Sequence, residues 1–240
     1  MRVVSWNCNR ALHEKWSLVI DLAPDILIVQ EAATPEVLRD RGVPLPEQVH
    51  WVGGLEHQGL LVVAFRDYKL RVADPYFPGL HWVLPLHVDG PEAFTLLATY
   101  DLYTMSAQGD PDAAKSDALI TALTRYRHLL DSGNVVLAGD FNNNKKLYRP
   151  KESRYFAPTV AALDALGYVS AYHAHRHEAH GEETEPTYYQ WFRQERPHHI
   201  DFCFVPVSWR IDDVVVGDYE PWVSHRRSDH APVVVDVSPT

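Results

Sequence analysis

The segment at residues 135–144 constrains the fold of this chain more than any other. It starts with two valines and stays apolar, as a strand buried on both faces does, and then stops at Gly139, Asp140 and three asparagines. If the backbone stays extended for two more residues, Asp140 and Asn142 lie on the same side. A carboxylate beside an amide donor suits phosphate chemistry. Gly, Asp and Asn are also ordinary turn residues, so a plain polar turn is the alternative.

The beginning of the chain has the same organisation. Strand, helix and strand are expected in succession over residues 2–7, 15–22 and 26–31. In such a β-α-β unit the strands are parallel, so Asn7 and Glu31 are expected at the same edge of a sheet. The alternative role for Glu31 is to cap a helix that begins near Thr34.

The middle of the chain changes to shorter strands. Asp, Pro or Gly separates the antiparallel strands expected at residues 59–65, 69–72 and 81–88. A further apolar strand over residues 94–100 ends at Tyr100, and residues 112–130 form the longest predicted helix. That helix leads into the strand that ends at Asp140. The second half therefore repeats the first, with a carboxylate at a strand end.

The last third of the chain supplies another carboxylate and a histidine. One helix and three strands are expected at residues 159–166, 199–206, 211–216 and 231–237. Asp201 lies in an apolar strand, and a buried carboxylate needs a partner. Histidine is the commonest such partner in a catalytic site, and His230, directly before the last strand, is the one we select.

Residues 173–185 contain four histidines among acidic residues, namely His173, His175, His177 and His180. Histidine-rich tracts of this kind also occur in metal sites. We predict an exposed acidic and histidine-rich loop instead, because no apolar framework in the neighbouring sequence fixes the geometry of ligands.

Composition limits the class of protein. An apolar fraction of 46% in 240 residues supplies a substantial core, and no linker divides the chain, so one domain over residues 1–240 is expected. A run of about 18 apolar residues and a signal-peptide pattern are both absent from the sequence, which predicts a cytoplasmic protein without a membrane segment. Cys8 and Cys203 are expected to be buried thiols and not a disulfide. We expect a monomer.

The formal charge of −10 disfavours broad non-specific attraction to nucleic acid. It does not exclude a nuclease, because acidic ligands of a divalent cation contribute to that charge. A local basic patch at residues 145–151, which begins with Lys145, can contact phosphates whatever the net charge is.

The series of polar residues resembles the endonuclease/exonuclease/phosphatase superfamily, which includes exonuclease III, DNase I and neutral sphingomyelinases. The residues that carry the resemblance span almost the whole chain and are Asn7, Glu31, Tyr100, Asp140, Asn142, Asp201, Ser228, Asp229 and His230. The resemblance implies a DNase I-like α/β (α+β) fold. In this four-layer α/β/β/α sandwich, helices flank two packed mixed sheets.

The resemblance also implies roles for these residues. Glu31 is the principal ligand of Mg²⁺ or Mn²⁺, helped by Asn7 and Asp229. Asp140 and Asn142 lie at the attacking water and the phosphate. Asp201 orients His230, and Tyr100 matches the tyrosine of the exonuclease III branch.

Candidate substrate contacts are Asn9, Tyr188, Trp191 and Lys145. Asn9 stands where several nucleases of the family have a carboxylate. The aromatic residues Tyr188, Tyr189 and Trp191 resemble the region where abasic-site nucleases hold a flipped nucleotide, and a strand packed on a core fits them equally well.

Together these residues predict a divalent-metal-dependent phosphodiesterase, with nucleic acid as the leading substrate. Phosphate-ester hydrolysis needs a cation, an activated water and donors to the phosphoryl oxygens. Glu31 offers hard oxygen, Asp140 can accept a proton, and Asn7, Asn142, Tyr100 and His230 can hold the phosphate. The alternatives are a phosphoesterase for a small nucleotide or lipid headgroup, and a binding module that keeps the fold without catalysis.

Overall fold

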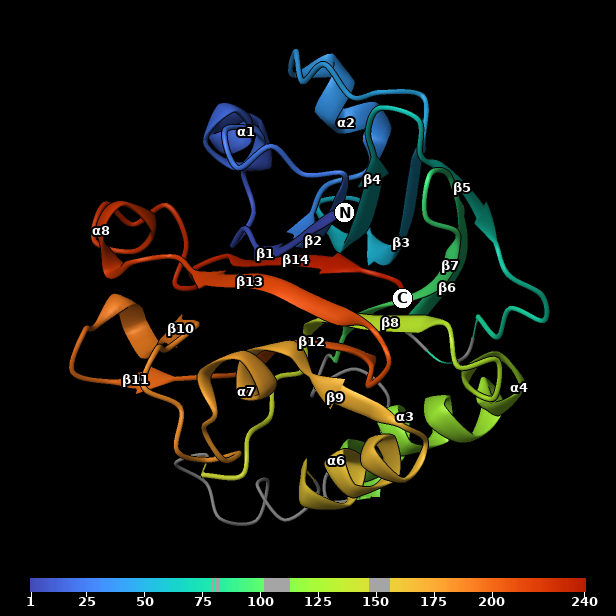
Figure 1. Cartoon of the computed structure of the whole chain (residues 1–240). Coiled ribbons are helices and arrows are strands. Elements are labelled where there is room, and N and C mark those ends of the chain that lie inside the picture. Colours follow the sequence, from blue (N-terminus) through green and yellow to red (C-terminus); the bar gives the residue numbers. More distant parts are fainter. Residues whose placement is uncertain (79, 81–82, 102–112, 147–155) are drawn as a thin grey trace.

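The computed structural model describes the whole chain apart from residues 79, 81–82, 102–112 and 147–155. Of residues 113–118 it describes the backbone and not the side chains. Two six-stranded sheets lie face to face, with helices on their outer sides (Figure 1). The first sheet has the order β13 (Arg210–Val216), β14 (Val233–Ser238), β1 (Arg2–Asn7), β2 (Ile26–Ala32), β4 (Gln58–Ala64) and β3 (Val49–Leu55). The second has the order β5 (Lys69–Val72), β6 (Val83–Asp89), β7 (Phe94–Tyr100), β8 (Val135–Asp140), β12 (Asp201–Pro206) and β9 (Tyr168–Ser170).

Helices cover the outer face of each sheet. Helices α1 (Leu12–Ile20) and α2 (Pro35–Asp40) flank the first sheet, and α3 (Ala113–Arg125), α4 (Arg127–Leu130) and α6 (Phe156–Ala165) flank the second (Figure 1). The smaller elements are α7 (Ala171–Arg176), β10 (Tyr188–Tyr189), the 3₁₀ turn η1 (Gln190–Phe192), β11 (Pro197–His198) and α8 (Tyr219–Trp222). The predicted four-layer sandwich is therefore confirmed.

Each sheet contains one parallel pair, and the predicted β-α-β unit of the first sheet is present. Strands β1 and β2 are parallel and joined by α1, and β7 and β8 are parallel and joined by α3 and α4. The predicted long helix is interrupted at Tyr126, whose buried hydroxyl accepts a hydrogen bond from the backbone of Phe77 at 3.2 Å. Because parallel strands end at the same edge, each pair brings polar strand ends together.

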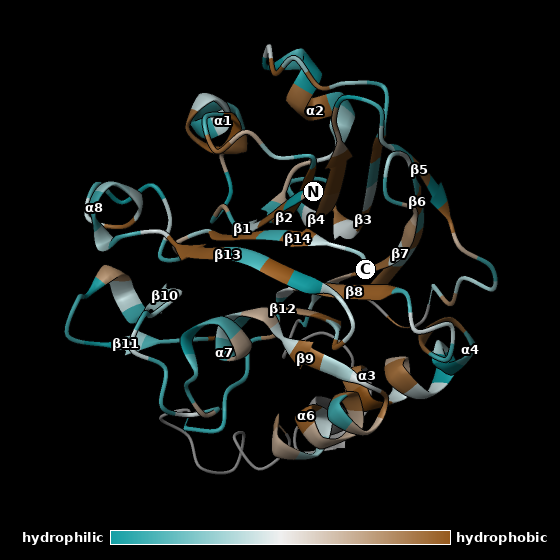
Figure 2. Cartoon of the chain, viewed as in Figure 1, coloured by the Kyte–Doolittle hydropathy of each residue, from teal (hydrophilic) through white to brown (hydrophobic). Residues whose placement is uncertain are grey.

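Strand β8 is buried on both faces, which explains its continuous apolar run. Val136 and Ala138 belong to the hydrophobic cluster that joins the two sheets, whereas Val135 and Leu137 belong to the cluster beneath α3, α4 and α6. The alternation follows the two-residue period of a strand. Figure 2 accordingly shows β8 as hydrophobic over most of its length.

The prediction of an exposed loop at residues 173–185 is wrong for His173 and His180. His173 lies on α7 and is only 7% exposed, and both imidazoles lie near aromatic rings of β12, His173 near Phe202 and His180 near Phe204. The apolar framework that the neighbouring sequence lacks comes from a distant strand. His177, in contrast, is exposed.

Two further expectations concern the thiols and membrane segments. Cys8 and Cys203 are buried free thiols, as predicted. Among the described residues, no helix has both the length and the apolar character needed to cross a membrane.

Candidate active site

Three predicted site residues form a row across the second sheet. Tyr100 at the end of β7 lies beside Asp140 at the end of β8, and Asp140 lies opposite Asp201 at the start of β12. Gly139 makes the row possible because it has φ +149° and packs closely on β7. A Cβ at this position would lie 1.8 Å from the backbone oxygen of Thr99.

Asn142 reaches Asp140 through a turn and not through an extended backbone. Its φ is +45°, a left-handed conformation that asparagine tolerates better than most residues. The Asn142 backbone N donates to Asp140 Oδ1 at 2.8 Å, and its Nδ2 donates to Oδ2 at 3.2 Å. Asn7 Nδ2, from the first sheet, donates to the same Oδ2 at 3.1 Å. Asp140 is thus held by donors from both sheets.

The predicted pair of Asp201 and His230 is present. His230 Nδ1 lies 2.9 Å from Asp201 Oδ2, and its Nε2 lies 3.9 Å from Asp140 Oδ2. Ser228 fixes this end of the chain, because its hydroxyl donates to the backbone oxygen of Asn7 and accepts from the backbone N of His230. Asp140, Asp201 and His230 are all buried, with exposures of 0%, 0% and 4%.

Burial sets the protonation of this group. Burial, followed by the negative charge of Asp201, raises the pKa of Asp140 above its ordinary value. Burial alone lowers the pKa of His230, but the adjacent charges of Asp201 and Asp140 outweigh it and raise that pKa. The arrangement favours a charged imidazole between two carboxyl groups, and it favours the protonated form of Asp140 more than water does.

A β-bulge in β2 orients the Glu31 side chain toward Tyr100 and Asn7. The pairing of β2 with β4 shifts register between Val29 and Ala32, and Glu31 has φ +57°, which is rare for this residue type. Its carboxylate accepts from Tyr100 Oη at 3.2 Å and from Asn7 Nδ2 at 3.5 Å. The alternative capping role is not found, because Thr34 caps α2 through Val37 N.

Asn9 and Asp229 form the rim beside Glu31. Asn9 has φ +46°, its backbone N donates to Asn7 Oδ1 at 3.0 Å, and its Nδ2 donates to Asp229 Oδ1 at 2.9 Å. A carboxylate at position 9 would repel Asp229, whereas the amide holds it. The departure from the family pattern therefore orders Asp229 and removes one negative charge.

The oxygens at this rim fit a hard divalent cation. Glu31 keeps 21% of its side chain exposed, and Asn7 and Asp229 add amide and carboxylate oxygens. Asp140, Asp201 and His230 also have ligand atoms within 4.8 Å of one another. These three side chains are buried and face one another, although Asp201 Oδ1 has no hydrogen-bond partner among the described residues. The more exposed Glu31 side therefore fits a cation better.

The residues predicted to contact substrate do not lie together in the structure. The Tyr188 ring lies 4.7 Å from the His230 ring, whereas Tyr189 is a buried core residue that packs on Tyr219. Trp191 is 61% exposed, with the guanidinium of Arg196 4.4 Å from its ring. Lys145 is exposed and lines a separate cavity of about 530 Å³ beside His173 and His180, and residues 147–151 of the basic patch lie outside the described residues.

Two supporting residues were missed in the sequence. The buried Thr187 hydroxyl accepts from the backbone N of Ile200 at 3.0 Å and of Asp201 at 3.1 Å, which fixes the start of β12. Gln58 Nε2 donates to Tyr100 Oη at 3.4 Å. Neither residue stands out in the sequence, because each acts through a partner far along the chain.

Enzymes that act on phosphate esters share this fold. The chain belongs to the Endonuclease/Exonuclease/phosphatase family, whose model matches residues 4–230. The resemblance inferred from the sequence is thereby confirmed. No protein of curated function matches the chain in sequence.

Solved structures show the same fold. The 3′ phosphatase NExo from Neisseria, bound to a product DNA hairpin, is 22% identical, with 99% of each chain covered and a TM-score of 0.63. An AP endonuclease from Archaeoglobus fulgidus is 18% identical over 98% of each chain, with a TM-score of 0.68. Truncated TDP2 from Caenorhabditis elegans is 16% identical over 98% of this chain and 96% of that chain, with a TM-score of 0.63.

Proposed function

We propose that this protein is a divalent-metal-dependent phosphodiesterase that acts on nucleic acid, with residues 1–240 working as one domain. The observation that carries the proposal is that Asn7 Nδ2 links the buried group of Asp140, Asp201 and His230 to the half-buried Glu31. A buried acid–base group next to accessible hard oxygens is what metal-assisted ester hydrolysis requires.

In the proposed mechanism Asp140 takes the proton of the attacking water. Its raised pKa suits this role, because a general base works best when its pKa lies near the working pH. Asn142 holds the Asp140 carboxylate through two hydrogen bonds and can turn its amide to a phosphoryl oxygen.

His230 stabilises the charge on the phosphate. Asp201 accepts a hydrogen bond from His230 Nδ1, which directs Nε2 to the Asp140 side. There Nε2 can donate a hydrogen bond to a phosphoryl oxygen. Tyr100 donates to Glu31 and remains protonated, because burial, followed by the charge of Glu31, raises its pKa. Asp201 therefore acts as a positioning residue for the imidazole.

Glu31, Asn7 and Asp229 would hold the cation, for which Mg²⁺ or Mn²⁺ is the natural choice given an all-oxygen donor set. When bound, such an ion neutralises the charge that develops on the phosphate.

Nucleic acid is favoured over a small ester by the surface beside Tyr188. Trp191 is exposed and lies under Arg196 and Arg193, with guanidinium carbons 4.4 and 6.0 Å from its ring. Exposed aromatic rings that stack on bases, together with arginines that pair with phosphates, are typical of single-stranded nucleic-acid contacts. A small nucleotide or lipid headgroup would leave this surface unused.

A substrate panel tests the proposal. Purified protein with Mg²⁺ or Mn²⁺ is assayed on single-stranded, duplex and abasic DNA, on RNA and on bis-p-nitrophenyl phosphate, with Asp140→Asn as the control for contaminating nuclease. We expect metal-dependent hydrolysis of a nucleic acid that Asp140→Asn loses. Tight oligonucleotide binding without hydrolysis of any substrate would identify a binding module instead.

The free thiols of Cys8 and Cys203 support the cytoplasm as the proposed location, since reducing compartments keep thiols unpaired. We propose that the protein acts as a monomer, which gel filtration with light scattering can test.

A further inference from the structure

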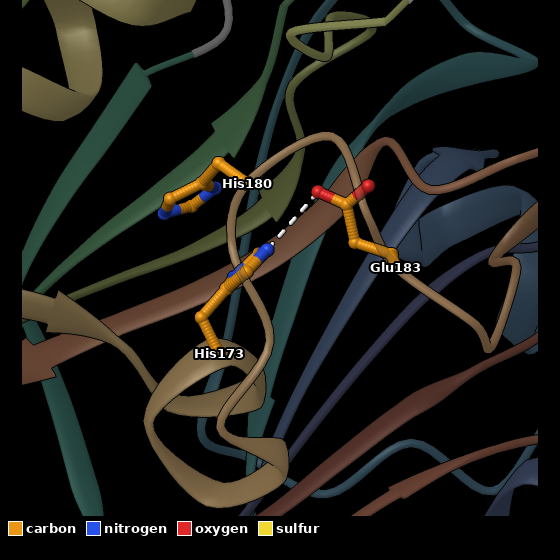
Figure 3. A group of neighbouring side chains, drawn as sticks. All are labelled: His173, His180 and Glu183. Carbon is orange, nitrogen blue, oxygen red and sulfur yellow. Dashed lines mark hydrogen bonds and ion pairs between the residues drawn. The ribbon is translucent and has the colours of Figure 1, made fainter.

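A second group of potential metal ligands lies away from the proposed active site. His173, His180 and Glu183 have ligand atoms that all lie within 4.8 Å of one another (Figure 3). His173 Nε2 is 3.0 Å from Glu183 Oε1, and the two imidazole rings stack with their centroids 3.5 Å apart. We call these three residues the distal histidine cluster.

The distal histidine cluster is surrounded by aromatic rings. The Phe202 ring lies 6.1 Å from His173, and the rings of Phe156 and Phe204 lie 5.7 and 6.1 Å from His180. The side chains of His173 and Glu183 are only 6% and 5% exposed. An apolar shell of this kind limits the access of water and strengthens electrostatic contacts between ligands and an ion.

Outer contacts orient the donors. His173 Nδ1 lies 2.8 Å from Ser170 Oγ, which leaves Nε2 for Glu183, and the backbone N of Gly181 donates to Glu183 Oε1 at 2.8 Å. Metal-binding histidines commonly have their second nitrogen fixed in this way.

One imidazole nitrogen of the distal histidine cluster lacks a hydrogen-bond partner among the described residues. His180 Nδ1 is buried and has no hydrogen-bond partner among the described residues, and the same holds for Nε2 of the adjacent His199. His199 Nδ1 is already used by the backbone oxygen of Glu185 at 2.7 Å, and its ring centroid lies 6.0 Å from that of His173. Buried polar atoms without a partner are rare and require an explanation, and a bound ion is one.

We propose that the distal histidine cluster is a structural binding site for a transition-metal dication of the Zn²⁺ type. Two imidazole nitrogens and one carboxylate oxygen form a donor set that Zn²⁺ accepts, whereas Mg²⁺ and Ca²⁺ prefer oxygen alone. Because the rings are stacked, His180 must turn for both nitrogens to face one ion. The cavity of about 530 Å³ beside it, lined in part by Ala179 and Lys145, provides the space.

The position of the site suggests what the ion does. It would tie α7 to the segment 177–187, which leads to Thr187, and Thr187 accepts from the backbone N of Ile200 and Asp201. The ion would therefore stabilise a segment that supports the start of β12. It takes no part in the proposed hydrolysis.

Metal binding tests the proposal directly, without an activity assay. Metal-free protein carrying Glu31→Gln, which weakens the proposed active-site cation site, is titrated with Zn²⁺ by calorimetry and with Co²⁺ by visible absorption. We expect one equivalent bound and a higher Tm in Zn²⁺. His180→Gln and Glu183→Gln should each lower the Zn²⁺ affinity by at least about tenfold. Even the loss of a residue that only supports a ligand lowers metal affinity by about that factor.

His177→Asn is the matched control, because His177 is an exposed histidine from the same segment and its φ of +58° suits asparagine. It should bind Zn²⁺ as the parent does. Far-UV circular dichroism and Tm without metal establish that each variant is folded, and if His180→Gln is not folded, Glu183→Gln decides alone.

The proposal is overturned if the Glu31→Gln protein binds no Zn²⁺, or if the bound equivalent survives in a folded His180→Gln or Glu183→Gln variant. In that event the cluster is a hydrogen-bonded packing contact. Neither result bears on the proposed phosphodiesterase activity, which depends on other residues.

Discussion

Two clusters of histidine and carboxylate residues occur in the described part of this molecule, and they differ in their surroundings more than in their composition. The strand-end cluster consists of Asp140, Asp201 and His230, and the distal histidine cluster lies beside α7. Both bring ligand atoms within 4.8 Å of one another, and both are largely buried. Residue type and burial alone therefore do not identify a catalytic site.

Neighbouring residues separate the two clusters. The strand-end cluster adjoins the accessible carboxylate of Glu31 and lies among residues with strained backbones, since Glu31, Asn9 and Asn142 all have positive φ. The distal histidine cluster lies against three phenylalanine rings, and the segment beside it has one non-glycine residue with positive φ, His177. Backbone strain concentrates at functional sites, where the fold holds side chains in orientations that relaxed chains avoid.

The largest expected effect comes from the strand-end cluster. Asp140→Asn and His230→Ala should each lower kcat by about 10² to 10⁴, the usual contribution of a general base or of a donor to the transition state. Because both act in one transition state, the double variant should lose far less than the product of the single losses. Steady-state kinetics on the best substrate of the panel measure this.

Asp201→Asn should resemble His230→Ala, because Asp201 acts through that imidazole. His177→Asn, from the distal segment, is the control and should keep kcat within about twofold, as surface changes normally do. Near-parental turnover in Asp140→Asn would mean that the strand-end cluster is not catalytic.

Loss of the active-site cation is the next effect in size. Glu31→Gln should abolish measurable Mn²⁺ binding at the proposed cation site of Glu31, Asn7 and Asp229, because an amide oxygen lacks the charge that holds a hard dication. Calorimetry measures the affinity, and the Zn²⁺ equivalent at the distal histidine cluster should remain. Parental Mn²⁺ affinity in this variant would show that Glu31 is not the principal ligand.

The geometry of the strand-end cluster depends on Gly139. Gly139→Ala should destabilise the fold by about 3 kcal/mol, because a side chain there combines an unfavourable φ with a collision against β7. Gly133→Ala is a matched control with φ +69° and no atom within 4 Å of the added Cβ, and should lose only about 1 kcal/mol. Urea unfolding measures both, and equal losses would argue against the close approach of β7 and β8.

The smallest expected effect concerns substrate contact. Trp191→Ala should raise KM for single-stranded nucleic acid about fivefold, which corresponds to about 1 kcal/mol, the lower end for stacking on a base. Hydrolysis of bis-p-nitrophenyl phosphate, which has no base, should keep its KM. Equal changes on both substrates would mean that Trp191 affects the strand-end cluster and not nucleic-acid binding.

The sequence by itself determined the parts of the fold that local pattern encodes. Apolar runs that stop at polar residues identified β1, β2, β7 and β8, and the helix between β1 and β2 identified the first parallel pair. Because parallel strands end at one edge, the strand pattern was enough to bring Asn7 beside Glu31. The position of Tyr100 beside Asp140 followed only from the pairing of β7 with β8. The pairing of Asp201 with His230 followed from the need of a buried carboxylate for a partner.

Only the tertiary structure decided the aim of Glu31 and the surroundings of the distal histidine cluster. Glu31 faces the site because β4 pairs with β2 across a bulge, and a register shift between two strands has no signature in either strand alone. His173 is buried and His180 is half-buried because Phe202 and Phe204, far along the chain, pack against them. Burial is a property of long-range neighbours, so the polarity of residues 173–185 by itself indicated an exposed loop.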